Sequence, residues 1–322
     1  MTQTLPETDL TQLSAADWLA RLEDIGEEAG YFEPLGARHS AFFADEGPVL
    51  LVTFETMNSI RDTQDDQLPM GYAITRKHGW SHLSIIAHED SWYRDPRVFA
   101  YFDRLVDDAF FEDFDQVVFY GAGMAAYAAA AFSVTAPGAT VLLVQPQATL
   151  DPRVSGWDHR HTEMRRTSFT DRYGYGPDMI EGAGEVFVIY DPDQPLDAMH
   201  AALYTKPFVT KLPCPYAGSE IADLLSSFKI LQPIIEAACD DKFTASTFWK
   251  LYRARRNSPR FLRQISGRLL EEGRPFLNAL LCRNAATRLN GPRFRARQGQ
   301  LEAELKAQGR SLPPVRRPEL AE

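Results

Sequence analysis

The residues with the clearest chemical meaning form a glycine turn between an apolar run and an alanine-rich run. Residues 117–120 are apolar, Gly121, Gly123 and Ala125 form the turn, and residues 126–132 are rich in alanine. A G-x-S-x-G turn of this kind, a nucleophile elbow, joins a strand to a helix and displays a serine hydroxyl for attack on an acyl group. Gly123 stands at the serine position and Ala125 at the second glycine position. The sequence therefore predicts the turn without its nucleophile.

Strands alternate with helical patterns along most of the chain. This order predicts an α/β fold with a doubly wound, mostly parallel sheet, followed by a small all-α C-terminal extension. The predicted strands cover residues 39–44, 49–54, 82–86, 116–120, 141–144, 186–190 and 208–212. Ligands bind such sheets at the carboxyl ends of the strands. The ligand-binding residues expected at that edge are Glu55, Gly121, Gly123, Met124, Gln147 and Asp191, with Ser219 as a further lining residue.

Composition and punctuation suggest four segments. We expect an N-terminal tail and helix at 1–38, an α/β domain at 39–239, a helical extension at 240–308 and a disordered tail at 309–322. Within the α/β domain, residues 156–184 are irregular and rich in Arg, Asp and Gly, so we expect an insertion or cap there.

Charge is divided unevenly between the two parts of the chain. Residues 1–239 hold 16 Lys and Arg against 36 Asp and Glu, whereas residues 240–322 hold 18 against 8. A basic C-terminal part can bind an acidic partner or a polyanion, although a solvated basic helical face is the plainer interpretation. No recognised nucleic-acid-binding module accompanies it, so nucleic acid is not expected as a partner.

The remaining composition favours a soluble cytoplasmic protein of bacterial type. Cys214, Cys239 and Cys282 lie far apart and form neither a disulfide framework nor a zinc pattern. The N-terminus has no basic and apolar regions of a signal peptide, and no apolar run is long enough to span a membrane. No cofactor and no metal are expected.

The stretch from 119 to 153 resembles the α/β-hydrolase superfamily. It contains the elbow, then Pro137-Gly138, and then the run Gln145-Pro146-Gln147-Ala148-Thr149-Leu150-Asp151-Pro152-Arg153. It is most similar to bacterial members with a G-x-S-x-G-G-Y elbow and a P-Q-x-x-L-D-P loop. The resemblance covers residues 48–239 and implies a sheet that carries a nucleophile, an acid and a histidine in that chain order.

The resemblance places the catalytic triad on Gly123, Asp191 and Ser219, with Asp193 or Asp197 as alternatives for the acid. Acyl transfer needs a nucleophile and a base within hydrogen-bonding distance of each other. Gly123 has no side chain, and a serine hydroxyl at Ser219 is no base at neutral pH. Glycine also adopts the strained elbow geometry without penalty. A retained fold with a lost catalytic centre is therefore expected, and the free N–H groups of the helix after Gly123 can still bind an anion or carbonyl.

Other motifs in the chain carry weaker signals. A dinucleotide-binding G-x-G-x-x-G would need glycine at Ala126. His159, His161 and Glu163 have metal-ligand types, but they lie in a segment that does not read as a strand, and a surface loop is the better interpretation. Cys214 is interpreted as a buried thiol, and His82 as a structural histidine.

Three functional hypotheses follow. The first is a degenerate hydrolase-fold protein that acts as a small-molecule-binding or interaction module. The second is an active hydrolase or acyltransferase with relocated groups, for which Cys214, His82 and His159 are candidates. The third is a protein that binds a partner or polyanion through its basic C-terminal helices.

Overall fold

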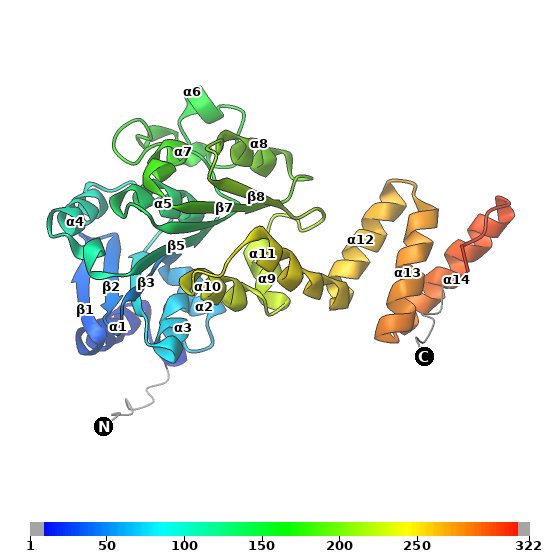
Figure 1. Cartoon of the computed structure of the whole chain (residues 1–322), viewed down its shortest axis with the longest axis horizontal. Coiled ribbons are helices and arrows are strands. Elements are labelled where there is room, and N and C mark those ends of the chain that lie inside the picture. The colour runs from blue at the N-terminus through cyan, green and yellow to red at the C-terminus, as the bar shows by residue number, and fades with distance from the viewer. Residues whose placement is uncertain (1–9, 315–322) are drawn as a thin grey trace. The chain divides into compact units, whose positions relative to one another are not determined.

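The computed structural model describes residues 10–314, and the chain separates into two compact units, residues 1–248 and 249–322. The division falls after residue 248, nine residues beyond the predicted end of the α/β domain. Figure 1 shows the elements of each unit along the chain. No helix among the described residues is long and apolar enough to cross a membrane.

An eight-stranded sheet forms the centre of the first unit, with the strand order β1-β2-β4-β3-β5-β6-β7-β8. The strands are β1 (Gly30–Pro34), β2 (His39–Ala44), β3 (Val49–Thr56), β4 (Ser81–Ala87), β5 (Gln116–Ala122), β6 (Thr140–Val144), β7 (Glu185–Tyr190) and β8 (Val209–Pro213). β2 pairs antiparallel with β1 and β4, and every other pair is parallel. The predicted doubly wound, mostly parallel sheet is confirmed.

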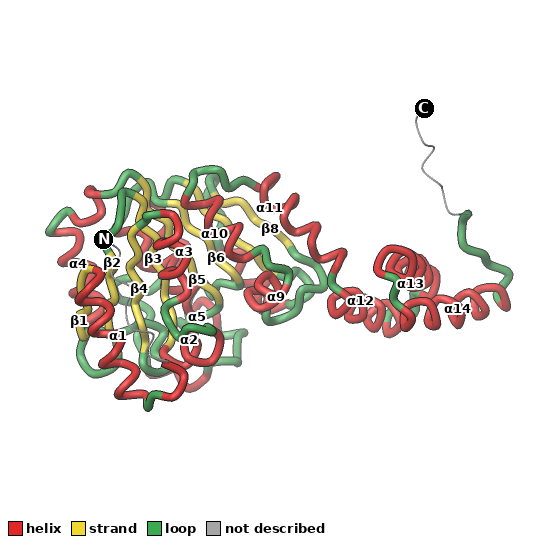
Figure 2. The backbone as a smooth tube through the Cα atoms, turned by 90° about the horizontal axis from the view of Figure 1, so that it is seen from below, coloured by secondary structure: helices red, strands yellow, loops and turns green. Residues whose placement is uncertain are grey.

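Helices cover both faces of this sheet, as Figure 2 shows. The helices of the first unit are α1 (Ala15–Ala29), α2 (Met57–Thr63), α3 (Met70–His78), α4 (Pro96–Asp107), α5 (Met124–Phe132), α6 (Pro152–Ser155), α7 (Gly176–Met179), α8 (Pro195–Leu203), α9 (Ile221–Ser227) and α10 (Leu231–Cys239), and α11 (Ala245–Tyr252) spans the division between the units. Short 3₁₀ segments are η1 (Leu10–Gln12), η2 (Phe110–Asp113), η3 (Ser133–Thr135), η4 (Thr162–Arg166), η5 (Ile180–Gly182) and η6 (Arg253–Asn257).

Two elements differ from the sequence expectation. β1 lies inside the segment 1–38, where only a tail and a helix were expected, and it extends the sheet by pairing with β2. The stretch at 55–69, which is polar and predicts a loop in the sequence, contains α2, which is capped reciprocally by the side chains of Thr56 and Ser59. Residues 315–322 of the predicted disordered tail and residues 1–9 of the predicted N-terminal tail lie outside the described residues.

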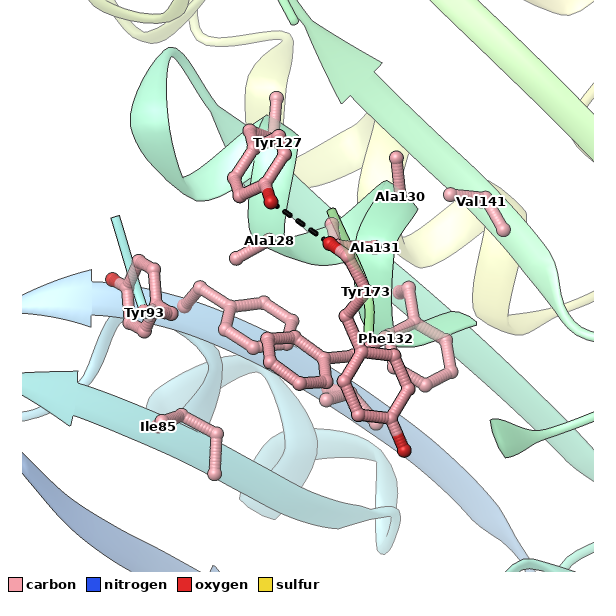
Figure 3. Close-up of a cluster of buried hydrophobic side chains, with 14 of the residues drawn as sticks. Ile85, Tyr93, Tyr127, Ala128, Ala130, Ala131, Phe132, Val141 and Tyr173 are labelled. Carbon is pink, nitrogen blue, oxygen red and sulfur yellow. Dashed lines mark hydrogen bonds between the residues drawn. The ribbon is translucent and has the colours of Figure 1, made fainter. Parts of the chain in front are cut away.

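Alanine makes α5 a closely packed and buried helix. Every residue from Ala126 to Phe132 is buried. The Phe132 ring stacks on Phe102 at a centroid distance of 4.3 Å, and the Tyr127 hydroxyl donates a hydrogen bond of 2.8 Å to the carbonyl oxygen of Tyr173, as Figure 3 shows. Small side chains let the helix axis approach the sheet, and close packing then fixes the helix start rigidly. That start is the glycine turn.

The second unit consists mainly of α12 (Pro259–Glu271), α13 (Pro275–Leu289) and α14 (Pro292–Ala307). Its core contains Leu262, Ala279, Cys282, Ala285, Phe294, Leu301 and Leu305. Within this core, Ser266 donates a hydrogen bond of 2.7 Å to Asn278 Oδ1, and Asn278 Nδ2 donates one of 2.9 Å to the Ser266 carbonyl oxygen. The small all-α C-terminal extension that the sequence predicted is therefore present.

Candidate functional site

Parallel pairing brings the ends of three neighbouring strands to one edge of the sheet. Thr53 on β3 lies opposite Tyr120 on β5, and Ala122 on β5 lies opposite Val144 on β6. Neighbouring strands are separated by about 4.8 Å. The residues that follow these positions, among them Glu55 and Gly123, therefore share the carboxyl edge, as the sequence predicted.

The glycine turn has the strained geometry of a nucleophile elbow. Gly123 has φ 58° and ψ −123°, a backbone conformation that residues other than glycine rarely adopt. A β-carbon built on Gly123 meets no atom within 4 Å, whereas one built on Gly121 lies 2.2 Å from the carbonyl oxygen of Ala125. Glycine is thus required at 121 by close approach and favoured at 123 only by backbone angle. The space that a nucleophilic side chain at position 123 would enter contains no described atom within 4 Å of its β-carbon.

The helix that follows presents free backbone donors at this turn. The Gly123 carbonyl oxygen accepts hydrogen bonds from the N–H groups of Ala126 and Tyr127, at 3.0 and 3.2 Å. Within residues 10–314 the N–H groups of Met124 and Ala125 have no hydrogen-bond acceptor. The first N–H groups of a helix carry partial positive charge and attract anions or carbonyl oxygens.

Asp191, at the position of the catalytic acid, accepts hydrogen bonds from backbone N–H groups. It is fully buried; its Oδ1 accepts a hydrogen bond from the Asp193 N–H at 2.9 Å, and its Oδ2 accepts one from the Gly218 N–H at 2.7 Å. The carboxylate therefore links the end of β7 to the loop after β8. Ser219, the next residue in that loop, is exposed, and its carbonyl oxygen accepts a hydrogen bond of 2.9 Å from Gln145.

Gln145 is a central polar residue whose role the sequence did not reveal. It is buried and has a positive φ of 52°. Its Nε2 also donates a hydrogen bond of 2.9 Å to Asp197 Oδ2, and its Oε1 accepts one of 2.8 Å from the Ile221 N–H. A single amide side chain thus holds α8, the 218–219 loop and the start of α9 together.

Glu55 lies at the end of β3 with several hydrogen-bond donors around its carboxylate. Its Oε1 accepts from the hydroxyls of Thr53 and Ser84 at 2.9 and 3.1 Å, and its Oε2 accepts from the Met70 N–H at 2.9 Å. Burial nevertheless raises the pKa of Glu55, because desolvation outweighs these bonds. Thr53 also bonds His82 Nε2 at 2.9 Å, and burial lowers the pKa of His82 to about 3.

Gln147 and Met124 complete the set of predicted ligand-binding residues. Gln147 is buried, and its side-chain Oε1 has no hydrogen-bond partner among the described residues. Met124 is half-buried, and its Sδ lies 3.3 Å from the Trp92 N–H, which donates to it. The Trp92 ring in turn contacts His161 of the insertion edge-on, at a centroid distance of 4.8 Å.

A buried histidine on α8, His200, binds the insertion through a network that the sequence did not reveal. Nδ1 of His200 accepts a hydrogen bond of 3.1 Å from the Ala148 N–H, so its Nε2 carries the proton and donates to Asp158 Oδ2 at 3.0 Å. Arg160 pairs with both Asp158 and Asp197, at 2.8 and 2.6 Å. Burial lowers the pKa of His200 despite the Asp158 carboxylate. Because both ring nitrogens are engaged, this histidine has no nitrogen left for a substrate.

The other candidates are also engaged in structural contacts. The Cys214 thiol is buried and donates to the Leu212 carbonyl oxygen at 3.5 Å. His159 Nδ1 accepts from Arg165 at 3.2 Å. No group of three or more His, Cys, Asp or Glu residues suited to a metal ion occurs within the described residues.

A cavity of 590 Å³ lies at the other end of the strands. Its lining includes Gln116 and Val117 at the start of β5 and Thr140 at the start of β6, together with Leu105 and Phe111. This cavity is separate from the predicted ligand-binding edge, because the two occupy opposite ends of the same strands.

The strand order, the antiparallel second strand and the strand–elbow–helix unit define an α/β-hydrolase fold. No family model matches the sequence, and no characterised relative was found by sequence. Structural comparison finds an esterase of Pyrobaculum calidifontis, 12% identical, with a TM-score of 0.44 over 73% of this chain and 95% of that chain.

Two further solved structures are similar. One is EstE1, a thermostable carboxylesterase cloned from a metagenomic library, 11% identical with a TM-score of 0.42 over 73% of this chain and 98% of that chain. The other is a capsule O-acetyltransferase of Neisseria meningitidis serogroup A, 11% identical with a TM-score of 0.36 over 62% and 92%. At these low scores the fold assignment depends on the sheet order and the elbow of this chain itself.

Proposed function

We propose that the first unit is a catalytically inactive α/β-hydrolase-fold protein that binds a small molecule bearing a carbonyl or carboxylate group. The supporting observation is the elbow, which keeps its strained geometry at Gly123 while displaying no side chain. A strained backbone costs on the order of 1–3 kcal/mol when a residue other than glycine adopts it. Glycine keeps the turn at little cost, and the turn still presents the N–H groups of Met124 and Ala125.

The surroundings of the elbow argue against acyl transfer through a covalent intermediate. That reaction needs a nucleophile, a base that removes its proton, and an acid that orients the base. Gly123 supplies no nucleophile, and both oxygens of Asp191 accept backbone hydrogen bonds. Ser219 stands where the histidine would be. Each triad position thus lacks its reactive group or uses it for folding.

The same edge is suited to binding. A carboxylate or carbonyl oxygen can accept from the N–H groups of Met124 and Ala125, and the helix dipole contributes about 0.3–1 kcal/mol to such contacts. Gln147 offers a buried amide oxygen without a partner to a donor on the ligand.

An active enzyme with relocated groups finds less support. Cys214 is buried among its own loop contacts, His82 is fully buried, and His159 contacts Arg165 in the insertion. A relocated base needs an accessible nitrogen beside a nucleophile. Within the described residues, His82 Nε2 bonds only a buried hydroxyl, that of Thr53 at 2.9 Å, and both side chains are fully buried.

Binding is tested by thermal shift and calorimetry with acetate, butyrate, benzoate, succinate and their methyl esters. Stabilisation by at least one member of the panel is expected, and it should disappear in Gly123→Leu, whose side chain fills the open position. Gly79→Leu is the matched control, because Gly79 also has a positive φ (67°) and open space but caps α3. Equal loss of binding in both variants would count against the elbow as the site.

Inactivity is tested separately with p-nitrophenyl acetate and butyrate. Wild-type protein is expected to give the rate of buffer alone. Turnover above that rate, abolished by Asp191→Ala in a variant that still folds, would rule out the proposal and favour an active hydrolase.

A further inference from the structure

The second unit carries a large excess of positive charge that its own acidic residues do not neutralise. Residues 249–314 contain fifteen Lys and Arg against four Asp and Glu, and thirteen of the fifteen are arginines. Of the acidic residues, Glu272 pairs with Arg268 and Arg274 at 3.3 Å each. Like charges held close together on a folded surface repel one another, which lowers stability unless a partner neutralises them.

Five of these arginines form what we term the arginine patch: Arg253, Arg256, Arg260, Arg263 and Arg288. All five are exposed, and within the described residues none forms an ion pair with a carboxylate. The first four follow one another along η6 and the first turns of α12. Arg288, near the end of α13, donates hydrogen bonds to the carbonyl oxygen of Arg256 and to the side chain of Asn257. The fold therefore brings the end of α13 against η6 and adds a fifth cation.

The opposite face of α12 is buried, and Leu262 on it belongs to the core of the second unit. Phe261, Leu262 and Leu269 are buried, so the helix presents Arg260 and Arg263 to solvent. An anionic membrane is bound by helices that carry a continuous apolar face beside the basic one. Here those apolar residues are already buried, and Leu270 is the one large apolar residue of α12 that is strongly exposed, at 54%.

We propose that the arginine patch binds the phosphate backbone of a nucleic acid without reading its sequence. Guanidinium groups bind phosphate through two parallel hydrogen bonds, and arginine outnumbers lysine here by thirteen to two. The sequence contains no recognised nucleic-acid-binding module. Backbone contacts need no module, because they carry no base specificity.

The experiment measures fluorescence anisotropy of a labelled 20-nucleotide RNA of mixed sequence with the full chain, between 50 and 300 mM NaCl. Affinity should fall steeply with salt, with a slope of about −0.7 for each phosphate neutralised on a single strand. The patch variant carries Arg253→Gln, Arg256→Gln, Arg260→Gln and Arg263→Gln. It should bind at least about 10-fold more weakly and show a shallower salt slope, because each lost contact removes one released counterion.

The matched control removes the same charge from the first unit. It carries Arg38→Gln, Arg76→Gln, Arg104→Gln and Arg153→Gln, all exposed arginines that already pair with carboxylates. It should bind RNA like the wild type, and circular dichroism should show both variants folded. The proposal is overturned if the wild type shows no salt-dependent binding, or if the control loses as much affinity as the patch variant. Binding to phosphatidylglycerol vesicles or to polyglutamate that is as tight as binding to RNA would overturn it as well.

Discussion

Restoring the missing hydroxyl by Gly123→Ser tests the interpretation of the elbow. A β-carbon at Gly123 meets no atom within 4 Å, so no steric cost is expected beyond the backbone strain at φ 58° and ψ −123°. Strain of this kind costs roughly 1–3 kcal/mol. In a domain of this size, each kcal/mol lowers the melting temperature by roughly 2–4 °C. The variant should therefore fold, with a melting temperature a few degrees below that of the wild type.

Gly121→Ser is the contrasting variant, because Gly121 is tightly enclosed where Gly123 is not. A side chain at Gly121 would place its β-carbon 2.2 Å from the Ala125 carbonyl oxygen, an overlap that only movement of α5 could relieve. Gly121→Ser should fail to fold or lose well over about 3 kcal/mol of unfolding free energy. Urea denaturation followed by circular dichroism measures both variants. Equal stability of Gly121→Ser and Gly123→Ser would refute the assigned turn geometry.

The restored serine should remain unreactive. Within residues 10–314 no histidine is hydrogen-bonded to Asp191, and Ser219 cannot accept the proton that a serine nucleophile must lose. Hydrolysis of p-nitrophenyl butyrate by Gly123→Ser should stay at the rate of buffer alone. Turnover in this variant would mean that a base faces the elbow, which would refute the inference that the catalytic centre is lost.

Three further predictions concern the polar groups that hold the edge together. Asp191→Ala should lower the free energy of unfolding by about 1–3 kcal/mol for each stranded N–H group, whereas Asp191→Asn should lose less because one oxygen still accepts; urea titration distinguishes them. Gln145→Gly keeps the positive φ but removes three hydrogen bonds, so it should lose more stability than an exposed Gln300→Gly control, and amide exchange at Ile221 should accelerate. His82 has a folded pKa of about 3, below its unfolded value, so the unfolded chain binds more protons between pH 6.5 and 3 and stability should fall as pH falls through that window. His82→Asn should flatten this dependence in urea titrations from pH 7 to 4. An unchanged pH profile in the variant would contradict the burial of a neutral His82.

Local patterns were enough to predict the sheet and the elbow. The apolar run before Gly121, the two glycines and the alanine-rich helix lie within a few residues of one another, so their spacing specifies strand, turn and helix directly. The same holds for Asp191, which directly follows an apolar strand. Their chemistry could be inferred because the motif assigns each position a role.

Long-range polar contacts could not be predicted in this way. His200 and Asp158 are 42 residues apart, and Asp158 lies in an irregular insertion without periodicity, so nothing in the sequence pairs them. The positive φ of Gln145, which orients its amide toward Asp197, Ser219 and Ile221, leaves no trace in composition. α2 was hidden because its cap uses Ser59 where glutamate or glutamine is the usual signal.

The sequence predicts the charge of the C-terminal part but not which of its arginines are paired. Net charge showed that the C-terminal part is basic, but only the structure separates arginines that pair with Glu272 from the unpaired arginine patch. The number of charged residues is known from the sequence, but the folded structure is needed to know which of them are free to contact a partner.

The proposed function requires that the nucleophile elbow of this protein carries no reactive group. Intact-protein mass spectrometry of the native wild type after treatment with a fluorophosphonate probe, and separately with iodoacetamide, tests it most directly. We expect the unmodified mass in both reactions, because Gly123 has no side chain and Cys214, Cys239 and Cys282 are all buried. A single fluorophosphonate adduct, mapped to a residue at the carboxyl edge of the sheet, would contradict the claim.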